Sequence, residues 1–194
     1  MLLLGIDGVV IRDERLLGHV KDNWIRYVRQ KLPESRPAET TRILQLVHGH
    51  PALGLERAFQ IDTSDFIDKV YDDSLISHLY DVLDHKEFGR DVRDLERPVT
   101  LFTNAPERWA RPVASSLGPD VSWVCPGHYK PDQKSYSQFS DKINYIFIDD
   151  SIKNLTATRN LPNWKPVFYN QNSEKVGWCP SICSLYDVNR IYPL

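Results

Sequence analysis

Side chains that can transfer protons or bind an anion follow three short apolar segments. They are Asp7 after residues 2–4, Thr103 and Asn104 after residues 99–102, and Asp149 and Asp150 after residues 145–148. Short apolar segments that end in turns are typical of buried strands. Open α/β sheets place their ligand sites at the carboxyl ends of the strands. The pattern therefore predicts that these side chains lie together at one edge of a sheet, where a carboxylate can act as a general acid or base.

Each of these residues also has a purely structural interpretation. Asp149 and Asp150 could cap the helix that follows them, since capping alone favours Asp. Asp7 could form a turn beside Gly8, and Lys130 could be a solvated lysine of a later loop. These interpretations explain the residues separately, but they do not explain why all of them fall at the same edge of one predicted sheet.

The elements that would position these residues alternate between strand and helix from about residue 97 onward. This alternation predicts a parallel sheet with right-handed crossovers and helices on both faces. We expect strands over residues 99–102, 121–124, 145–148 and 166–169, and helices between Pro106 and Gly118 and over residues 135–142, 152–159 and 184–188. Pro112 predicts a kink or an early break in the first of these helices.

Residues 13–95 have a helical pattern instead, with apolar side chains at helical spacing. The expected helices include Trp24 to Leu32, residues 43–47, residues 66–70 after the capping residues 63–65, and residues 75–83. Residues 50–55 are expected to form a loop or short turn. His48 and His50 lie on a loop of this segment that could face the cleft, but surface or packing roles are expected for them, because no third metal ligand is evident.

The composition is typical of a globular protein. Of 194 residues, 41% are hydrophobic and 26% are charged, and the formal net charge is −2. This net charge gives no reason to expect nucleic-acid binding, and no apolar run approaches the length of a membrane span. Three cysteines, Cys125, Cys179 and Cys183, are too few for a disulfide scaffold. Such a count is typical of a reducing compartment, and we expect a cytoplasmic protein.

Four segments resemble, in order, the four motifs of the haloacid dehalogenase (HAD) superfamily. They are Leu2–Val10, Val99–Ala105, Lys130–Asp132 and Tyr145–Ser151. The resemblance covers almost the whole chain. It implies a Rossmann-like α/β core of residues 1–12 and 96–194, with a helical cap of residues 13–95 inserted between the first two motifs. Parts of this cap, residues 49–55, 61–66 and 71–75, resemble the pyrimidine 5′-nucleotidase-like branch of the superfamily.

The resemblance also implies a role for each polar residue. Asp7 would be the general acid and base. The phosphoryl group would be bound by Thr103, Asn104 and Lys130. Magnesium, which takes oxygen ligands, would be held by Asp149, Asp150 and the backbone carbonyl of Asp7. The implied ligand is a small phosphorylated molecule such as a nucleoside monophosphate, and a protein partner is left open.

The residue at position 5 decides between two hypotheses. The superfamily motif, Asp-x-Asp-Gly, places its nucleophilic aspartate two residues before Asp7, and that position is Gly5. Glycine can neither attack phosphorus nor bind a metal ion, and loss of a nucleophile can cost roughly a million-fold in rate. We therefore expect a phosphohydrolase homologue whose ordinary phosphotransfer is lost or strongly reduced and whose Mg²⁺ binding is weakened. The alternative is an active, magnesium-dependent phosphatase or 5′-nucleotidase with altered chemistry.

Overall fold

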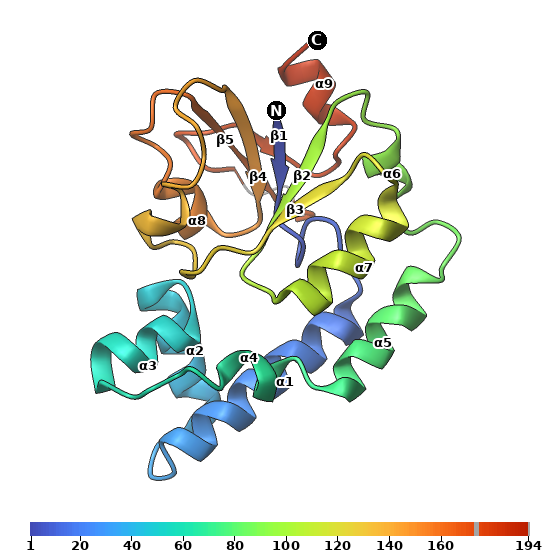
Figure 1. Cartoon of the computed structure of the whole chain (residues 1–194). Coiled ribbons are helices and arrows are strands. Elements are labelled where there is room, and N and C mark those ends of the chain that lie inside the picture. The colour runs from blue at the N-terminus through green and yellow to red at the C-terminus, as the bar shows by residue number, and fades with distance from the viewer. Residues whose placement is uncertain (173–174, 194) are drawn as a thin grey trace.

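Six parallel strands form one sheet in the computed structural model, which describes residues 1–172 and 175–193. The strands are β1 (Leu2–Leu4), β2 (Val99–Phe102), β3 (Ser122–Val124), β4 (Tyr145–Asp149), β5 (Trp164–Tyr169) and β6 (Ser181–Ile182). Their order across the sheet is β3-β2-β1-β4-β5-β6, so β1 lies between β2 and β4 (Figure 1). All three leucines of β1 are completely buried. This burial on both faces explains why β1 is continuously apolar.

Alternate side chains of the strands face two separate apolar clusters. Leu2 and Leu4 belong to one cluster and Leu3 to the other, as the two-residue period of a strand requires. Helices α7 (Glu107–Leu117) and α9 (Asp187–Ile191) contribute buried residues to the first cluster, whereas α8 (Ile152–Thr156) contributes to the second. Helices therefore cover both faces of a parallel sheet, which confirms the predicted α/β fold class.

The chain between β1 and β2 is helical. It forms α1 (Glu14–Lys31), α2 (Pro37–His48), α3 (Pro51–Phe59), α4 (Phe66–Val70), α5 (Asp73–Leu83) and α6 (Arg90–Arg93). Residues 12–98, all of which the structure describes, contribute no strand to the sheet. Helix α1 is central to this segment because α2, α4 and α5 all contact it (Figure 1). Within the described part of the chain, no helix is both long enough and apolar enough to span a membrane.

The helical segment and the sheet share one apolar cluster. Leu79 of α5 belongs to the same cluster as Val113 of α7 and Leu4 of β1, and α5 packs directly against α7. Tyr71 lies edge-on to Trp109, with 5.3 Å between the ring centroids. The predicted division into a core of residues 1–12 and 96–194 and a cap of residues 13–95 stays a prediction.

Two proline-containing segments differ from the prediction. Residues 50–55 do not form a loop, because α3 begins at Pro51. The fixed φ of proline suits this first helical position, and Leu55 is completely buried. Helix α7 continues through Pro112 without the early break. Val113 is completely buried, so tertiary packing outweighs the backbone hydrogen bond that proline removes.

The helix predicted over residues 135–142 is absent from this described part of the chain. A short 3₁₀ turn over Gln133–Ser135 takes its place. The hydroxyl groups of Ser137 and Ser140 hydrogen-bond to nearby backbone groups, and such local bonds compete with a helix. Phe139 packs against the second apolar cluster instead.

Candidate functional site

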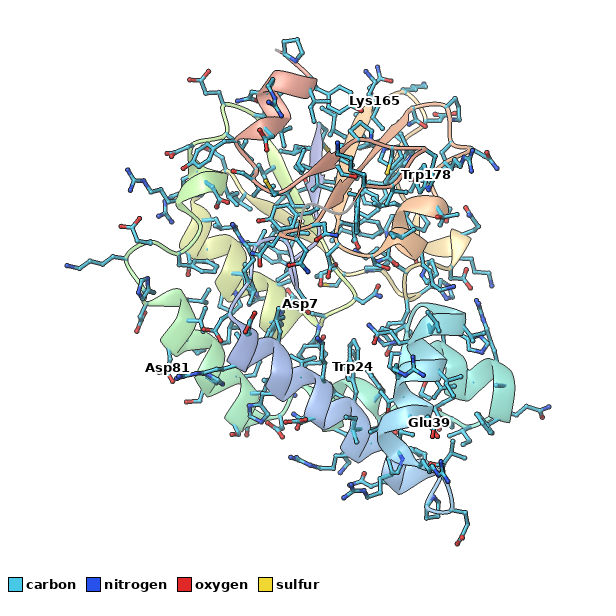
Figure 2. All side chains as sticks on the ribbon, turned by 180° about the vertical axis from the view of Figure 1, so that it is seen from behind. Asp7, Trp24, Glu39, Asp81, Lys165 and Trp178 are labelled. Carbon is cyan, nitrogen blue, oxygen red and sulfur yellow. The ribbon has the colours of Figure 1, made fainter. Side chains whose placement is uncertain are left out.

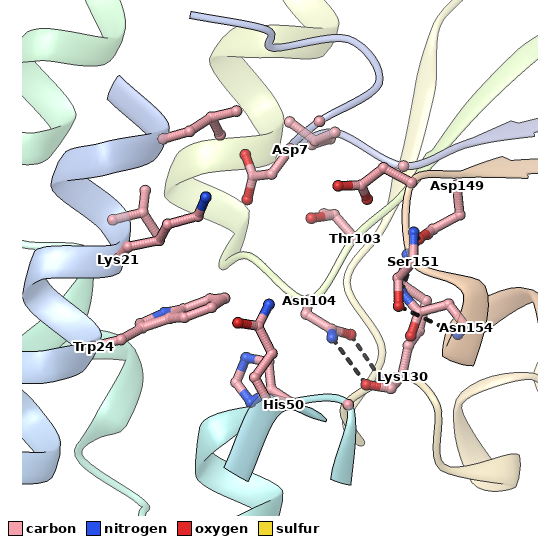
Figure 3. A pocket seen from close by; sticks show the side chains of 18 of the residues that line it. Asp7, Lys21, Trp24, His50, Thr103, Asn104, Lys130, Asp149, Ser151 and Asn154 are labelled. Carbon is pink, nitrogen blue, oxygen red and sulfur yellow. Dashed lines mark hydrogen bonds and ion pairs between the residues drawn. The ribbon is translucent and has the colours of Figure 1, made fainter. Parts of the chain in front are cut away.

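A pocket of about 280 Å³ lies between the carboxyl edge of the sheet and the helical segment. Asp7 and Trp24 lie at this junction (Figure 2), and Figure 3 shows the pocket from close by. All of the predicted site residues line it: Gly5, Asp7, Thr103, Asn104, Lys130, Asp149 and Asp150. The structure thus brings together residues from three strand ends and one loop, and their catalytic and ligand-binding roles stay predictions.

The loop after β1 places Gly5 directly at the predicted reaction centre. The Gly5 amide donates a 2.9 Å hydrogen bond to the carbonyl oxygen of Ile148, which ties the loop to β4. A Cβ built on Gly5 would lie 3.2 Å from Oδ2 of Asp149. The first atom of a side chain at position 5 would therefore lie beside the Asp149 carboxylate. Glycine has no such atom, so only its backbone faces Asp149.

Asp7 is the acid that this loop does present to the pocket. Its Oδ1 accepts a 3.0 Å hydrogen bond from Nε1 of Trp109 on α7. Burial raises the pKa of Asp7 to about 6, and the hydrogen bond from Trp109 opposes the rise. The residue stays partly open toward the pocket. A carboxyl group with this pKa can donate or accept a proton near neutral pH.

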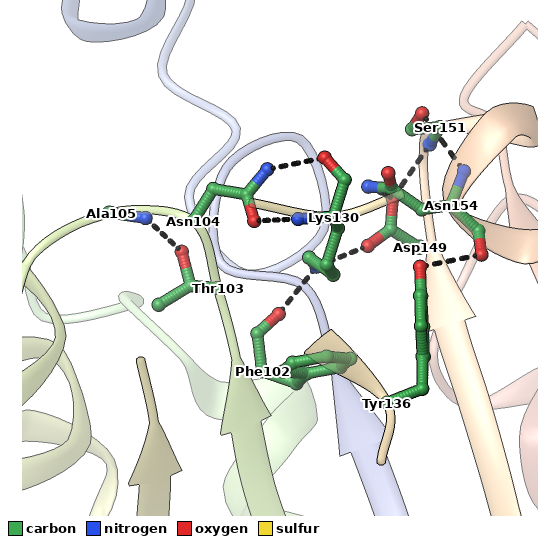
Figure 4. A network of polar contacts seen from close by, with 9 residues as sticks. All are labelled: Phe102, Thr103, Asn104, Ala105, Lys130, Tyr136, Asp149, Ser151 and Asn154. Carbon is green, nitrogen blue, oxygen red and sulfur yellow. Dashed lines mark hydrogen bonds and ion pairs between the residues drawn. The ribbon is translucent and has the colours of Figure 1, made fainter. Parts of the chain in front are cut away.

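Lys130 and Asp149 form a buried ion pair beside Gly5 (Figure 4). The Lys130 amine lies 2.7 Å from Oδ2 of Asp149 and 2.6 Å from the carbonyl oxygen of Phe102. The two side chains of the pair are only 4% and 2% exposed. So deep a burial is tolerated because the charges are paired and hydrogen-bonded. The pair fixes the amine at the carboxyl end of β2.

The side chain of Asn104 holds Lys130 in place. Its Oδ1 accepts a 2.7 Å hydrogen bond from the Lys130 amide, and its Nδ2 donates a 3.1 Å hydrogen bond to the Lys130 carbonyl oxygen. Both ends of the Asn104 amide are therefore used within the protein (Figure 4). The predicted contact of Asn104 with a substrate would have to come from its backbone.

The second oxygen of Asp149 is also engaged. Oδ1 accepts hydrogen bonds of 2.9 Å from the Ser151 amide and 2.9 Å from Nδ2 of Asn154. With Oδ2 bonded to Lys130, both oxygens of this carboxylate already have partners. Asp149 is thus part of the frame of the site.

These residues do not fit the whole predicted magnesium site. Asp149 is committed to Lys130 and its neighbours, and Gly5 supplies no carboxylate. Across residues 1–172 and 175–193, no three Asp, Glu, His or Cys side chains are placed to share one metal ion. Asp150 and the backbone carbonyl of Asp7 remain the predicted ligands.

Asp150 packs against a glycine that the loop requires. Gly8 has a φ of 83°, in the left-handed region, and a Cβ there would overlap the Asp150 carboxylate. Burial raises the pKa of Asp150, and the neighbouring charge of Asp149 adds to the rise. The residue keeps an exposed surface on the pocket side, and hydration of that surface limits the rise.

The helical segment supplies the opposite wall of the pocket, and His50 is the one residue of this wall that the sequence suggested could face the cleft. This wall contains Lys21 and Trp24 of α1, Gln45 of α2, His50 before α3, and Tyr71 after α4. Lys21, Trp24 and His50 face the core residues across the pocket (Figure 3). The spacing of Lys21 and Trp24 places them on one helix face, but this pattern alone does not say what the face meets. For His50, the expected packing role is joined by a position on the pocket.

No protein-family model matches the chain, and no curated protein matches it by sequence. Solved structures do match. A HAD phosphatase from Thermococcus onnurineus has a TM-score of 0.60 at 13% identity, covering 99% of this chain and 97% of that one. A haloacid dehalogenase-like protein from Agrobacterium tumefaciens has a TM-score of 0.54 at 12% identity, and the match covers 98% of this chain and 96% of that one. The L-2-haloacid dehalogenase from Xanthobacter autotrophicus has a TM-score of 0.52 at 8% identity, and the match covers 98% of this chain and 96% of that one.

These similarities extend over the sheet and the inserted helices together, since nearly the whole of each chain is covered. At such identities they establish the fold and leave the activity open. They do not single out the 5′-nucleotidase-like branch. The chain therefore has the fold of the haloacid dehalogenase-like hydrolases and phosphatases.

Proposed function

We propose that the chain is a phosphohydrolase homologue that binds a small phosphate ester, such as a nucleoside monophosphate, and has lost most or all ordinary phosphotransfer. One observation carries the proposal: the residue that the motif resemblance assigns to the attacking carboxylate is Gly5, which presents only backbone beside Asp149. A covalent phosphoryl intermediate needs a nucleophilic side chain there. Asp149, the nearest carboxylate to a Cβ at position 5, is paired with Lys130 and is not free to take its place.

Two groups of the core support binding of a phosphoryl group. The Lys130 ammonium has three hydrogens and uses two of them for Phe102 and Asp149. Thr103 Oγ1 accepts a hydrogen bond from the Ala105 amide and keeps its own hydrogen for a ligand oxygen. Charge-assisted hydrogen bonds from such donors suit phosphate oxygens. The pocket of about 280 Å³ lies near the lower end of the range of small-molecule sites, about 300–1,000 Å³, which favours a small ester.

One observation favours the alternative, a phosphatase with altered chemistry. Burial raises the pKa of Asp7 to about 6, which suits a general base at neutral pH. Such a base could activate a water for direct attack on a bound ester, with no aspartyl intermediate. Turnover by this route would disappear in Asp7→Asn and would rise with pH through about 6, as Asp7 loses its proton.

Calorimetric titration with orthophosphate and nucleoside monophosphates tests the proposal. We expect the wild type to bind them, and Thr103→Val to bind them about tenfold more weakly through loss of one hydrogen bond to a charged group. Thr158→Val is the matched control, because Thr158 is also buried but bonds to Leu155 on α8, outside the pocket lining. Absence of binding by the wild type to any of these ligands would contradict the proposal.

A further inference from the structure

Two polar atoms in the helical wall of the pocket have no partner. Within the described residues, Nε1 of Trp24 and Nδ1 of His50 are buried and make no hydrogen bond. Both residues line the pocket, and His50 is 97% buried because only 3% of it is exposed. An unsatisfied buried polar group is costly to stability, so native proteins rarely leave one without a use.

Aromatic contacts hold the His50 ring in a fixed orientation. It stacks on Tyr129 with 4.1 Å between centroids and an 11° angle between planes. The rings of Phe66 and Trp24 form T-shaped pairs with it, with 5.1 Å and 5.6 Å between the ring centroids. His50 is also the residue before α3, yet its side chain makes no capping hydrogen bond. The ring is therefore held by its aromatic neighbours, and its nitrogen atoms do not cap the helix that follows.

The protonation state of His50 restricts what this wall can accept. Burial lowers the pKa of His50 to about 3, so its imidazole is neutral at physiological pH. A neutral imidazole offers one donor and one acceptor, and an indole N–H is a donor only. The two unpartnered atoms thus offer hydrogen bonds without a charge, which suits an uncharged group with a hydrogen-bonding oxygen.

We propose that Trp24 and His50 form a subsite that recognises an uncharged, hydrogen-bonding group of the ligand, while its phosphate lies against the core. This inference rests on the proposed function, because the subsite is the opposite wall of the same pocket. Two sources share the required chemistry: the hydroxyl groups of a sugar, and the carbonyl and N–H edge of a nucleobase. Either group would satisfy Nε1 of Trp24 through an oxygen acceptor.

Calorimetry with three probes tests the subsite: orthophosphate, ribose 5-phosphate and uridine 5′-monophosphate. Trp24→Phe removes the N–H but keeps a ring, and His50→Phe removes Nδ1 but keeps the stacking. We expect both variants to weaken the binding of at least one ester about tenfold, the loss of one hydrogen bond, and to leave orthophosphate binding unchanged. The ester affected shows whether the sugar or the base occupies the subsite. Trp178→Phe is the matched control, since Trp178 packs against the second apolar cluster and does not line the pocket.

Indole N–H signals of the wild type give a second readout that needs no variant to fold. The Trp24 signal should shift on addition of an ester and stay in place with orthophosphate. Esters that bind no tighter than orthophosphate, or that bind both variants as tightly as the wild type, would overturn the subsite and leave phosphate binding intact. Failure of the wild type to bind orthophosphate and both esters would instead overturn the proposed function together with the subsite.

Discussion

The amine of Lys130 lies 2.7 Å from Oδ2 of Asp149, and this ion pair is almost completely buried beside Gly5. Each charge satisfies the other, and hydrogen bonds from Ser151 and Asn154 complete the Asp149 carboxylate. The pair therefore stabilises the strand ends without any contribution from position 5. Lys130 therefore needs no carboxylate at position 5 as its partner.

Breaking this pair from one side should cost much of the stability of the fold. We expect Lys130→Met to lower the free energy of unfolding by about 3–5 kcal/mol, because Asp149 would remain as a buried, unpaired charge. Lys134→Met is the matched control, since Lys134 is exposed. Urea denaturation of the two variants measures the difference. Equal stability of Lys130→Met and the control would contradict the buried pair.

Two glycine substitutions should change stability in opposite directions. Gly8→Ala is expected to destabilise by about 1–3 kcal/mol, because its φ of 83° disfavours a side chain and the added Cβ would overlap Asp150. Gly18→Ala is expected to stabilise by about 0.5–1 kcal/mol. Gly18 lies inside α1, and nothing lies within 4 Å of its added Cβ. Thermal unfolding of both variants measures the two changes in stability. A stabilising effect of Gly8→Ala would contradict the positive φ of Gly8 and its close contact with Asp150.

His50 should make the fold sensitive to acid. Because burial lowers its folded pKa to about 3, the unfolded chain binds a proton below its ordinary pKa of about 6.5, and stability is lost as pH falls from there toward 3. When the pH is lowered from 7.5 to 5, the free energy of unfolding of the wild type should fall by about 2 kcal/mol more than that of His50→Phe. His128→Phe, at an exposed position, should show no such difference. Urea denaturation at the two pH values decides the matter.

Asp7 should make the stability of the fold depend on pH in the opposite direction. Burial raises its folded pKa to about 6, so its contribution to stability is complete below the unfolded pKa of about 4 and is lost as pH rises through 6. We expect Asp7→Asn to exceed the wild type in stability by about 1–3 kcal/mol at pH 7.5 and to match it at pH 4. Asp22→Asn, at an exposed position on α1, provides the comparison. A less stable Asp7→Asn at pH 7.5 would contradict the burial of this carboxylate.

The strands and the core side of the pocket could be predicted because local pattern determines them. Leu2–Leu4 is too short and too apolar to be anything but a buried strand, and its neighbours β2 and β4 have the same character. Parallel strands end at one edge, so Asp7, Thr103 and Asp149 had to meet. The same argument does not predict which side chains hydrogen-bond to one another at that edge. An example is the side-chain amide of Asn104, which hydrogen-bonds to the backbone of Lys130.

Most of the helical wall could not be predicted, because it depends on tertiary packing; only His50 was a candidate from the sequence. Trp24 fits any amphipathic helix, and only the docking of α1 near the sheet turns its ring into the pocket (Figure 3). His50 reaches the pocket because α3 begins at Pro51 and because Tyr129, far along the chain, stacks on its ring. The segment 135–142 had helical periodicity, and local serine hydrogen bonds overrode it.

The central claim is that Gly5 leaves a phosphate ester bound but not hydrolysed. The most direct test measures release of orthophosphate from nucleoside monophosphates, with magnesium in the buffer, by the wild type and by Gly5→Asp. Gly5 is not among the glycines with positive φ, and its added Cβ would lie 3.2 Å from Oδ2 of Asp149, so the Asp149 side chain has to shift by a few tenths of an ångström to admit it. Circular dichroism would first establish that the variant folds. We predict no release by the wild type above the uncatalysed rate and measurable release by Gly5→Asp, whereas rapid release by the wild type that Gly5→Asp fails to increase would contradict the claim.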